Sequence, residues 1–324
     1  MNPAPIFDLF TSYQKTAAIQ ASVDIGLFTA IASGKTTVAE AARACKASEK
    51  GVRVLCDYWV INGLLTKSGA QYRLTPEAAM FLDGNSPAYV GRVLGFINGP
   101  IKPFFEKLTD SVRRGGFEDS GTVSTEYEGW IPFAEDMGGM MYPTAQGVAK
   151  LLGACAGRAL DIAAGHGYFG IVLAQHNPGL RVTALDWPKV LDVAKRHAEK
   201  MGVGDRYSTI PGDAFTVDFK GPYDVVLLTN LLHHFSAERC TELLKRIRAA
   251  LRPGGKLATV EFVPNEDRVT PEMSASFPLV MLATTAQGDA YTFSEFDRML
   301  NAAGFACSRV QQVENSPQQL IISE

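Results

Sequence analysis

The stretch that most constrains the fold of this chain is ALDIAAGHGYFGIVLA, residues 159–174. A short apolar run ends in small residues and in Gly165-His166-Gly167, and an apolar, helix-compatible segment follows. This pattern predicts a strand, a tight turn and a helix. Glycine tolerates positive φ and has no Cβ, so backbone can lie directly against a ligand at such a turn. The free N–H groups at the start of the helix favour a negative group.

The turn alone does not identify its ligand. Its spacing Gly165-x-Gly167-x-x-Gly170 satisfies the dinucleotide fingerprint, and the same pattern also fits a turn that binds nothing. Asp161 favours a different ligand. A strand acid four residues before Gly165 has no part in holding a pyrophosphate, but it suits a cationic or amine-bearing ligand.

Composition indicates a globular protein of about two domains, because the chain has 324 residues, 46% apolar content and a net charge of −3. This charge favours neither nucleic acid nor an anionic membrane as a partner. We expect a cytoplasmic protein, since no run of about 18 apolar residues occurs and MNPAPIFDLF lacks the features of a signal peptide. The five cysteines are scattered, which is typical of reduced core residues.

The first quarter of the chain has the pattern of a winged helix. An Ala-rich apolar helix is followed by a second helix that Thr36 or Thr37 can cap, and a third is predicted over residues 49–62. Gly63 ends that helix before two short strands around Ser68-Gly69. Three helices and a two-stranded wing are therefore expected.

A winged helix raises DNA binding as a second function, with helix 49–62 in the major groove. The charges of that helix are balanced in sign: Lys50 and Arg53 against Glu49 and Asp57. It therefore lacks the basic face that phosphate contacts require. The apolar first helix, together with Phe7, Leu9 and Phe10, is better suited to a partner subunit.

Residues 88–153 are predicted to be mainly helical and are rich in methionine and aromatic residues. Such a stripe is usually core, but this segment directly precedes the glycine turn and could cover a cleft for a flat ligand. A polar loop is expected over residues 113–121. The side chains that we expect to contact such a ligand are Trp130, Phe133, Met137, Met141 and, further along the chain, Met281.

After the glycine turn, strands and helices alternate as in an open parallel sheet. The strand at residues 181–185 ends at Asp186, where an acid can bind both hydroxyls of a ribose in either a nicotinamide or an adenosine ligand. A third strand, residues 207–210, is followed by Gly212-Asp213-Ala214-Phe215. This places a carboxylate and an aromatic face where they can meet an adenine.

The strand predicted over residues 224–229 runs into a histidine pair, His233-His234. Ligands bind at the carboxyl ends of parallel strands, so a histidine here favours a functional role. A helix over 238–251 should stop at Arg252-Pro253-Gly254-Gly255, and strand 256–262 then carries Glu261 near its end. We expect Glu261 and His233 to face the same cleft. A helix, 294–303, and an edge hairpin of strands 306–313 and 318–323 complete the pattern.

Taken in order, these motifs resemble the S-adenosylmethionine-dependent small-molecule O-methyltransferases of the plant caffeate type and their bacterial relatives. The residues that carry the resemblance are Leu160-Asp161-x-x-x-Gly165-x-Gly167, Asp186, Gly212-Asp213-x-Phe215, Leu232-His233, Leu251-Arg252-Pro253-Gly254-Gly255 and Glu261. Ile25-Gly26-Leu27-Phe28 and Tyr72-Arg73-Leu74-Thr75-Pro76 resemble the winged-helix dimerisation domain of that family.

The resemblance implies an α/β fold with three parts: a mainly helical winged-helix dimerisation domain at 1–90, a helical linker or lid at 91–153, and a Rossmann-like class I methyltransferase domain at 154–324. It implies a homodimer that acts on a small-molecule acceptor, with S-adenosylmethionine as methyl donor and S-adenosylhomocysteine as product. Nucleic acid, membrane and metal are not expected as partners, and no cluster of carboxylates has the spacing of Mg²⁺ ligands.

The resemblance also implies residue roles. His233 is the general base, Glu261 orients it, and His234 is a further catalytic candidate. Asp161 and the Gly165 turn face the methionine end of the cofactor, Asp186 the ribose, and Trp187, Asp213 and Phe215 the adenine. The full set expected to bind the cofactor is Asp161, Ala163, Gly165, Gly167, Asp186, Trp187, Gly212, Asp213, Ala214, Phe215 and Thr229.

Three positions depart from the family pattern. Ala163-Ala164-Gly165 stands in place of the usual three glycines, and His234 replaces the aspartate that commonly follows the base. Ala290 occupies the position of a second glutamate that flanks the base in plant members. A single orienting carboxylate can suffice, the enzyme can work mainly by positioning, or the acceptor atom can be a carbon. The alternatives to O-methylation are therefore C-methylation or another S-adenosylmethionine-dependent reaction, and a non-enzymatic winged-helix regulator.

Overall fold

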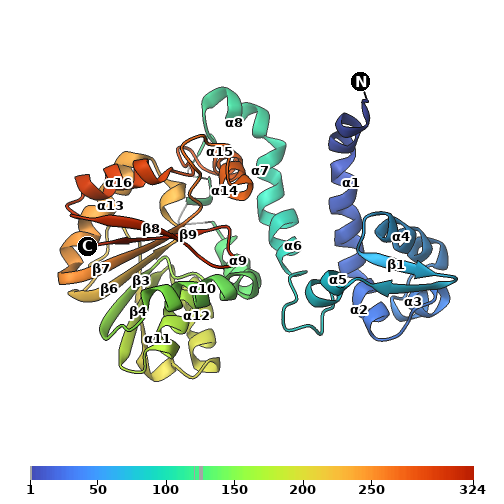
Figure 1. Ribbon diagram of the computed structural model, residues 1–324, viewed down its shortest axis with the longest axis horizontal. Helices are drawn as coiled ribbons and strands as arrows, with labels where there is room; N and C mark the ends of the chain where they lie inside the picture. Colours follow the sequence, from blue (N-terminus) through green and yellow to red (C-terminus); the bar gives the residue numbers. More distant parts are fainter. Residues whose placement is uncertain (1, 120, 124–126) are drawn as a thin grey trace. The chain divides into compact units, whose positions relative to one another are not determined.

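The computed structural model describes residues 2–119, 121–123 and 127–324, which form two compact units, Met1–Gly95 and Phe96–Glu324 (Figure 1). From Phe96 onward, the predicted lid segment belongs to the same unit as the sheet. The domain boundaries at residues 90 and 153 stay predictions. None of the described helices has the length and apolar character needed to span a membrane.

The first unit is the predicted winged helix. Its elements are α1 (Ala4–Asp24), α2 (Leu27–Ala32), α3 (Val38–Ala44), α4 (Glu49–Ile61), β1 (Leu65–Ser68), β2 (Gln71–Leu74) and α5 (Pro76–Phe81). Thr37, one of the two predicted caps, forms a capping box with Glu40 at the start of α3. Leu27, Phe28 and Trp59 lie in a core that the helices and the wing share.

The wing is held to α4 by one carboxylate. Asp57 accepts hydrogen bonds from Lys67 on β1 (2.6 Å), from the Tyr72 hydroxyl (2.7 Å) and from Arg53 (3.1 Å). These donors lower the pKa of Asp57 to about 2. Arg53, one of the two basic residues of the helix considered for DNA binding, is therefore already paired within the unit.

The second unit contains a seven-stranded sheet between helices. Its helices are α7 (Lys102–Glu106), α8 (Leu108–Arg114), α9 (Trp130–Asp136), α10 (Gly138–Leu152), α11 (Tyr168–His176), α12 (Pro188–Lys200), α13 (Ala237–Ala250), α14 (Glu272–Ser276), α15 (Pro278–Thr284) and α16 (Phe293–Ala302), with α6 (Val93–Phe96) at the junction of the units. Short π and 3₁₀ turns are η1 (Ile97–Ile101), η2 (Gly121–Val123), η3 (Gly204–Arg206) and η4 (Leu232–His234). Its strands are β3 (Gly157–Ile162), β4 (Leu180–Asp186), β5 (Tyr207–Pro211), β6 (Tyr223–Thr229), β7 (Leu251–Glu261), β8 (Ser308–Gln312) and β9 (Gln319–Ser323).

The strand order is β5-β4-β3-β6-β7-β9-β8, and the first five strands are parallel. β9 pairs antiparallel with β7 and β8, so the predicted hairpin forms and its second strand lies inside the sheet. Successive side chains on a strand face opposite sides of a sheet. On β6, Val225 and Leu227 join a core with α10 and α11, whereas Val226 and Leu228 join a core with α13 and α16. Both faces are covered, which explains the continuous apolar run at residues 225–228 of β6.

The predicted stop signal after α13 differs from the structure in one respect. The helix ends as expected, at Ala250, but β7 already begins at Leu251. Tyr223 pairs with Leu251 and Val225 with Lys256, so Arg252-Pro253-Gly254-Gly255 forms an irregularity within the strand pairing. Gly254 has φ +76°, a conformation that an L-residue rarely adopts.

Candidate active site

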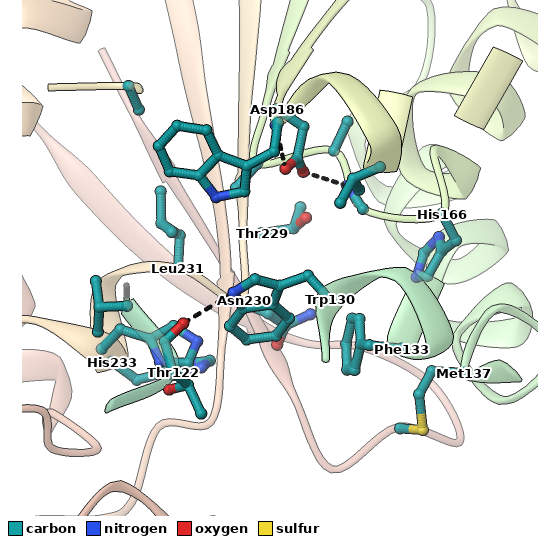
Figure 2. A pocket seen from close by; sticks show the side chains of 18 of the residues that line it. Thr122, Trp130, Phe133, Met137, His166, Asp186, Thr229, Asn230, Leu231 and His233 are labelled. Atoms are coloured by element: carbon teal, nitrogen blue, oxygen red, sulfur yellow. Dashed lines mark hydrogen bonds between the residues drawn. The ribbon is translucent and has the colours of Figure 1, made fainter. Parts of the chain in front are cut away.

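The carboxyl ends of the parallel strands border a cavity of about 520 Å³ in the second unit. Figure 2 shows several of the side chains around it, with Asp186 at the top of the view, His166 on the right and His233 at the lower left. The cavity is lined on the strand side by residues that follow β3, β4, β5 and β6. This is where an open α/β sheet binds its ligand.

The glycine turn after β3 is built as the sequence predicted. Ala163, Gly165 and Gly167 all have positive φ (55°, 56° and 80°), and α11 begins directly after Gly167. Ala163 and Gly165 line the cavity, whereas Gly167 does not. A Cβ on Gly167 would lie 2.7 Å from the Tyr207 hydroxyl, so this glycine is needed for packing beneath the turn.

Asp161 lies under the turn and outside the cavity lining. It is fully buried, its Oδ2 accepts the Gly170 N–H at 3.0 Å, and its Oδ1 has no partner. Burial raises the pKa of Asp161 to about 8. The carboxyl therefore holds the start of α11 against β3, and its contact with the methionine end of a cofactor stays a prediction.

Asp186, at the end of β4, braces the turn from the cavity side. Its Oδ2 accepts the Gly165 N–H (2.8 Å) and its Oδ1 the Trp187 N–H (2.7 Å). Burial raises its pKa to about 6, although the two N–H donors oppose this shift. Each carboxylate oxygen keeps acceptor capacity on the cavity side, which suits a pair of hydroxyl donors.

The turn after β5 supplies the next wall of the cavity. Asp213 Oδ1 accepts the Phe215 N–H at 2.9 Å, and the Gly212 N–H bonds Asp186 O at 3.0 Å. Phe215 packs against Phe235 with ring centroids 4.8 Å apart, and the Arg239 guanidinium lies 3.9 Å from the Phe215 centroid. Aromatic surface beside a polar turn fits a heteroaromatic ring.

His233 and Glu261 are in direct contact. His233 Nδ1 lies 2.5 Å from Glu261 Oε2, while Glu261 Oε1 accepts the N–H groups of Leu231 (3.0 Å) and Leu232 (2.8 Å). Because the carboxylate accepts at both oxygens, Nδ1 carries the proton and Nε2 of the neutral ring keeps its lone pair. Glu261 is fully buried behind His233, which lines the cavity.

His234 also lines the cavity but differs from His233 in its surroundings. Its Nδ1 is buried without a hydrogen-bond partner, and its ring meets Trp130 edge-on at 5.4 Å. Burial and the neighbouring His233 lower the pKa of His234 well below its usual value. No carboxylate among its hydrogen bonds fixes its tautomer, so it is the weaker candidate for a base.

The remaining wall is apolar. Aromatic, methionine and valine side chains from four segments line it: Trp130 and Phe133 from α9, Met137, Met140 and Met141 at and near the start of α10, Phe262 after β7, and Phe277, Val280 and Met281 around α15. Phe262 and Phe277 stack 4.1 Å apart, and Phe277 meets the His233 ring edge-on at 4.9 Å. Trp130 is fixed by a hydrogen bond from its Nε1 to Thr122 O at 2.8 Å. This half of the cavity fits a flat, apolar acceptor.

Comparison with known families identifies both units. An O-methyltransferase domain matches residues 150–306, and an O-methyltransferase dimerisation domain matches residues 7–84. A solved structure from Nostoc punctiforme, of a protein proposed to be an O-methyltransferase, is 45% identical, covers 100% of this chain and 99% of its own, and superimposes with a TM-score of 0.96. This chain belongs to the O-methyltransferase family.

Characterised relatives of this O-methyltransferase include a tetracenomycin polyketide synthesis 8-O-methyltransferase from Streptomyces glaucescens, 27% identical over 96% of this chain and 94% of its own length. A 3-hydroxy-5-methyl-1-naphthoate 3-O-methyltransferase from Streptomyces sahachiroi is 27% identical over 96% and 91%. Human N-acetylserotonin methyltransferase, solved with S-adenosylmethionine, shares the fold (22% identity, coverage of 99% and 96%, TM-score 0.84). The enzyme is an S-adenosylmethionine-dependent O-methyltransferase of small molecules.

The cavity of this O-methyltransferase fits that cofactor by its donor set. The glycine turn follows β3, the Asp186 carboxylate with its free lone pairs ends β4, and the aromatic face of Phe215 follows β5. Among the described residues, no three His, Cys, Asp or Glu side chains are grouped as metal ligands.

Most predicted site residues line this one cavity. Those that do are Ala163, Gly165, Asp186, Trp187, Gly212, Asp213, Ala214, Phe215, Thr229, His233, His234, Trp130, Phe133, Met137, Met141 and Met281. Asp161, Gly167 and Glu261 lie behind it, and Ala290 is buried outside its lining. The roles assigned to these residues stay predictions.

Several lining residues were not predicted. His166, assigned only to the glycine turn, lines the cavity; its Nδ1 accepts the Tyr168 N–H, and burial lowers its pKa to about 3. Phe262 and Phe277 flank His233, and Asn230 and Gln318 add two amides. A histidine inside the glycine motif and an asparagine before His233 are visible signals, but nothing in the sequence connects Gln318 to this edge of the sheet.

Proposed function

We propose that the enzyme methylates a hydroxyl group on an aromatic or polyketide-like small molecule, without a metal ion, with His233 as general base. The observation that carries this proposal is the His233–Glu261 pair, set in the aromatic wall of the cavity. A fully buried carboxylate that fixes the tautomer and leaves Nε2 free is the arrangement that a general base requires.

The cofactor half of the proposal rests on the strand ends. Asp186 would bind the ribose hydroxyls, Phe215 and Trp187 would contact the adenine, and the Gly165 turn would face the methionine end. When bound there, S-adenosylmethionine supplies an electrophilic methyl group. Asp161 would act indirectly, since it holds Gly170 and therefore the shape of the turn.

The acceptor half rests on shape and polarity. Trp130, Phe133, Met137, Met141 and Met281 would enclose a flat ring and exclude water from the reaction. His233 Nε2 would accept the hydroxyl proton as the oxygen becomes a nucleophile, and Glu261 would stabilise the charge that the ring gains. Proton removal contributes about 10² to 10⁴ in rate, and alignment of the two reactants contributes more. The substrates named for the two Streptomyces relatives, a polyketide and a naphthoate, support an aromatic acceptor.

The test compares histidine variants on an aromatic hydroxyl acceptor such as 1-naphthol, with S-adenosylhomocysteine formation as readout. His233→Ala should lower turnover by about 10² to 10⁴ because the base is removed. His234→Ala should lower it by less than about tenfold, since that ring has no orienting carboxylate. His176→Ala is the matched control, because His176 is exposed and bonds only Val172 O. Full turnover by His233→Ala would overturn the role of the base.

We also propose a homodimer that forms through the N-terminal unit. The dimerisation family matches residues 7–84, and α1 exposes a series of large apolar side chains: Ile6, Phe7, Leu9, Phe10 and Tyr13. Such a surface is expected to be covered by another chain. Light scattering should give the mass of two chains, and Phe7→Glu combined with Phe10→Glu should give one. A wild-type monomer at micromolar concentration would contradict this assembly.

A further inference from the structure

Two amides meet in the cavity at a place that neither the cofactor motifs nor the His233–Glu261 pair explains. Asn230 follows β6, Gln318 precedes β9, and both line the cavity. Gln318 Nε2 donates to Asn230 Oδ1. Gln318 is only 1% exposed, and its Oε1 has no partner. A buried amide oxygen that lacks a partner costs stability, so its presence here requires an explanation.

The hydrogen bond fixes what Asn230 presents to the cavity. With Oδ1 occupied by Gln318, the free group of Asn230 is its amide nitrogen, which donates to no group in the described parts of the chain. Asn230 also has φ +54°, while its backbone N–H bonds Val260 O at 2.9 Å. Asparagine is among the few residues that adopt this conformation readily. Asn230 Nδ2 therefore keeps its two N–H groups for a ligand in the cavity that the residue lines.

The position of the pair favours the acceptor over the cofactor. Apart from Thr229 at the end of β6, the residues proposed for the cofactor lie in or directly after β3, β4 and β5, whereas Asn230 follows β6 and Gln318 precedes β9, on the other side of β3. Between them runs β7, where Glu261 pairs with Gln319, the residue after Gln318. Asn230 also precedes His233 by three residues. Asn230 therefore lines the same cavity as His233 and comes from the same strand end, which favours a role in binding the acceptor.

The charge of the lining indicates the chemical class that these donors bind. Of the described lining residues, the only Lys or Arg is Arg239, and its guanidinium lies over Phe215 on the cofactor side. A carboxylate on the acceptor would have no cation beside Asn230. A neutral carbonyl oxygen needs only an N–H donor.

We propose that Asn230, positioned by Gln318, binds a carbonyl oxygen next to the reacting hydroxyl, so that the enzyme selects hydroxyaryl ketones and related neutral carbonyl compounds. This inference rests on the proposed function, because it assumes an aromatic hydroxyl acceptor. Asn230 determines specificity, and Gln318 is a positioning residue that acts through it.

The test uses two probes of similar size, 2-acetyl-1-naphthol and 2-ethyl-1-naphthol, which differ in the carbonyl oxygen. Calorimetry on the full-length enzyme saturated with S-adenosylhomocysteine gives both affinities. The wild type should prefer the ketone by about ten- to hundredfold, because a site built around a buried donor discriminates against a ligand without an acceptor.

Variants of Gln318 then separate positioning from packing. Gln318→Met removes the group that orients Asn230. The ratio of the affinities for the ketone and the ethyl compound should therefore fall close to one. Gln318→Glu replaces a donor by an acceptor, so Asn230 should turn its Oδ1 into the cavity and the enzyme should prefer the ethyl compound. The matched control is Gln311→Met: Gln311 also has a buried Oε1 without a partner but lies outside the cavity lining. It should keep the wild-type preference, and all variants should keep the wild-type affinity for S-adenosylhomocysteine.

Equal binding of the two probes by the wild type, or binding of neither, would overturn the proposal. So would a loss of S-adenosylhomocysteine affinity in the Gln318 variants with the probe preference retained, since the pair would then serve the cofactor. A methyl-transfer assay with the same two probes distinguishes failure of the Asn230 proposal from failure of the proposed function. If both probes are methylated equally well, the proposed function stands and the role of Asn230 fails. If the preference is present but neither hydroxyl is methylated, the proposed function fails.

Discussion

The two halves of the cavity are built differently. On the side that we propose binds the cofactor, short turns after β3, β4 and β5 present backbone N–H groups and carboxylates. The Asp186 carboxylate, for example, is fixed by the N–H groups of Gly165 and Trp187. On the acceptor side, side chains from α9, α10 and α15 supply apolar surface, and polar groups are few. A cofactor that never changes can be bound by fixed backbone, whereas acceptor specificity depends on side chains that can be exchanged.

The difference between the halves predicts which measured quantity each substitution changes. Residues on the cofactor side should change the affinity for S-adenosylhomocysteine, and residues beside His233 should change turnover or acceptor preference. A substitution that changes the quantity assigned to the other half would break this division.

The largest effect is expected for Glu261→Gln. An amide that donates to His233 Nδ1 would force the proton onto Nε2, so the ring could no longer accept a proton from the acceptor. Turnover should fall by about 10² to 10⁴, as expected when a base is held in the wrong tautomer. Affinity for S-adenosylhomocysteine, measured by calorimetry on the same sample, should change by less than about threefold and shows that the variant is folded. Unchanged turnover would contradict the orienting role of Glu261.

Asp186→Asn tests the cofactor half. The substitution removes the charge that accepts the ribose hydroxyls, so affinity for S-adenosylhomocysteine should fall by about a hundredfold. Turnover at saturating cofactor should change far less than in Glu261→Gln. The control is Asp192→Asn, because Asp192 lies on the exposed face of α12 and only contacts Lys195. If Asp186→Asn lost turnover but kept its affinity for S-adenosylhomocysteine, the assignment of Asp186 to the cofactor half would be wrong.

The pH dependence of binding sharpens the same assignment. The pKa of Asp186 is raised to about 6 by burial, and the ionised carboxylate is the form that accepts two hydroxyls. Affinity for S-adenosylhomocysteine should therefore strengthen by about fivefold between pH 5 and pH 6 and level off above about pH 7. In Asp186→Asn the profile should be flat over this range. A wild-type affinity that weakened as the pH rose from 5 to 7 would contradict binding by the ionised carboxylate of Asp186.

The smallest effect on binding is expected for Asp161→Asn. Asp161 bonds Gly170 behind the turn, and an amide can keep that bond, so affinity for S-adenosylhomocysteine should change by less than about threefold. A loss of tenfold or more would show that Asp161 contacts the cofactor.

The same variant has a predicted effect on stability. The folded-state pKa of Asp161, about 8, lies above the value of an unfolded aspartate, so folding favours the protonated form. Its contribution to stability is complete below about pH 4 and is lost as the pH rises towards 8. Urea unfolding should therefore show Asp161→Asn gaining stability relative to the wild type between pH 5 and 8. A constant difference would contradict the raised pKa.

Sequence reasoning was most successful where a local pattern determines a local structure. The glycine turn, the acid after β4 and the histidine after β6 each follow a strand, and parallel strands bring their carboxyl ends to one edge. The same logic brought Glu261 to His233 although 27 residues separate them in the sequence.

What sequence reasoning missed depends on tertiary packing. The bond from the Gly170 N–H to Asp161 depends on how α11 packs against β3, and the motif that singled out Asp161 does not contain this contact. Gln318 comes from the antiparallel strand that enters the sheet beside β7, and its partner Asn230 is 88 residues away. Phe277 contacts the His233 ring because α15 packs near the cavity. No periodicity in the sequence reports such contacts.

The central claim is that His233 removes a proton from an aromatic hydroxyl whose oxygen then takes the methyl group. It is tested most directly with S-adenosylmethionine labelled by carbon-13 in its methyl group and 1-naphthol as acceptor, with the product examined by NMR. The account predicts a labelled methyl bonded to oxygen in the wild-type reaction, and about 10² to 10⁴ less of it per unit time with His233→Ala. A labelled methyl bonded to a ring carbon, or equal O-methylation by both proteins, would contradict it.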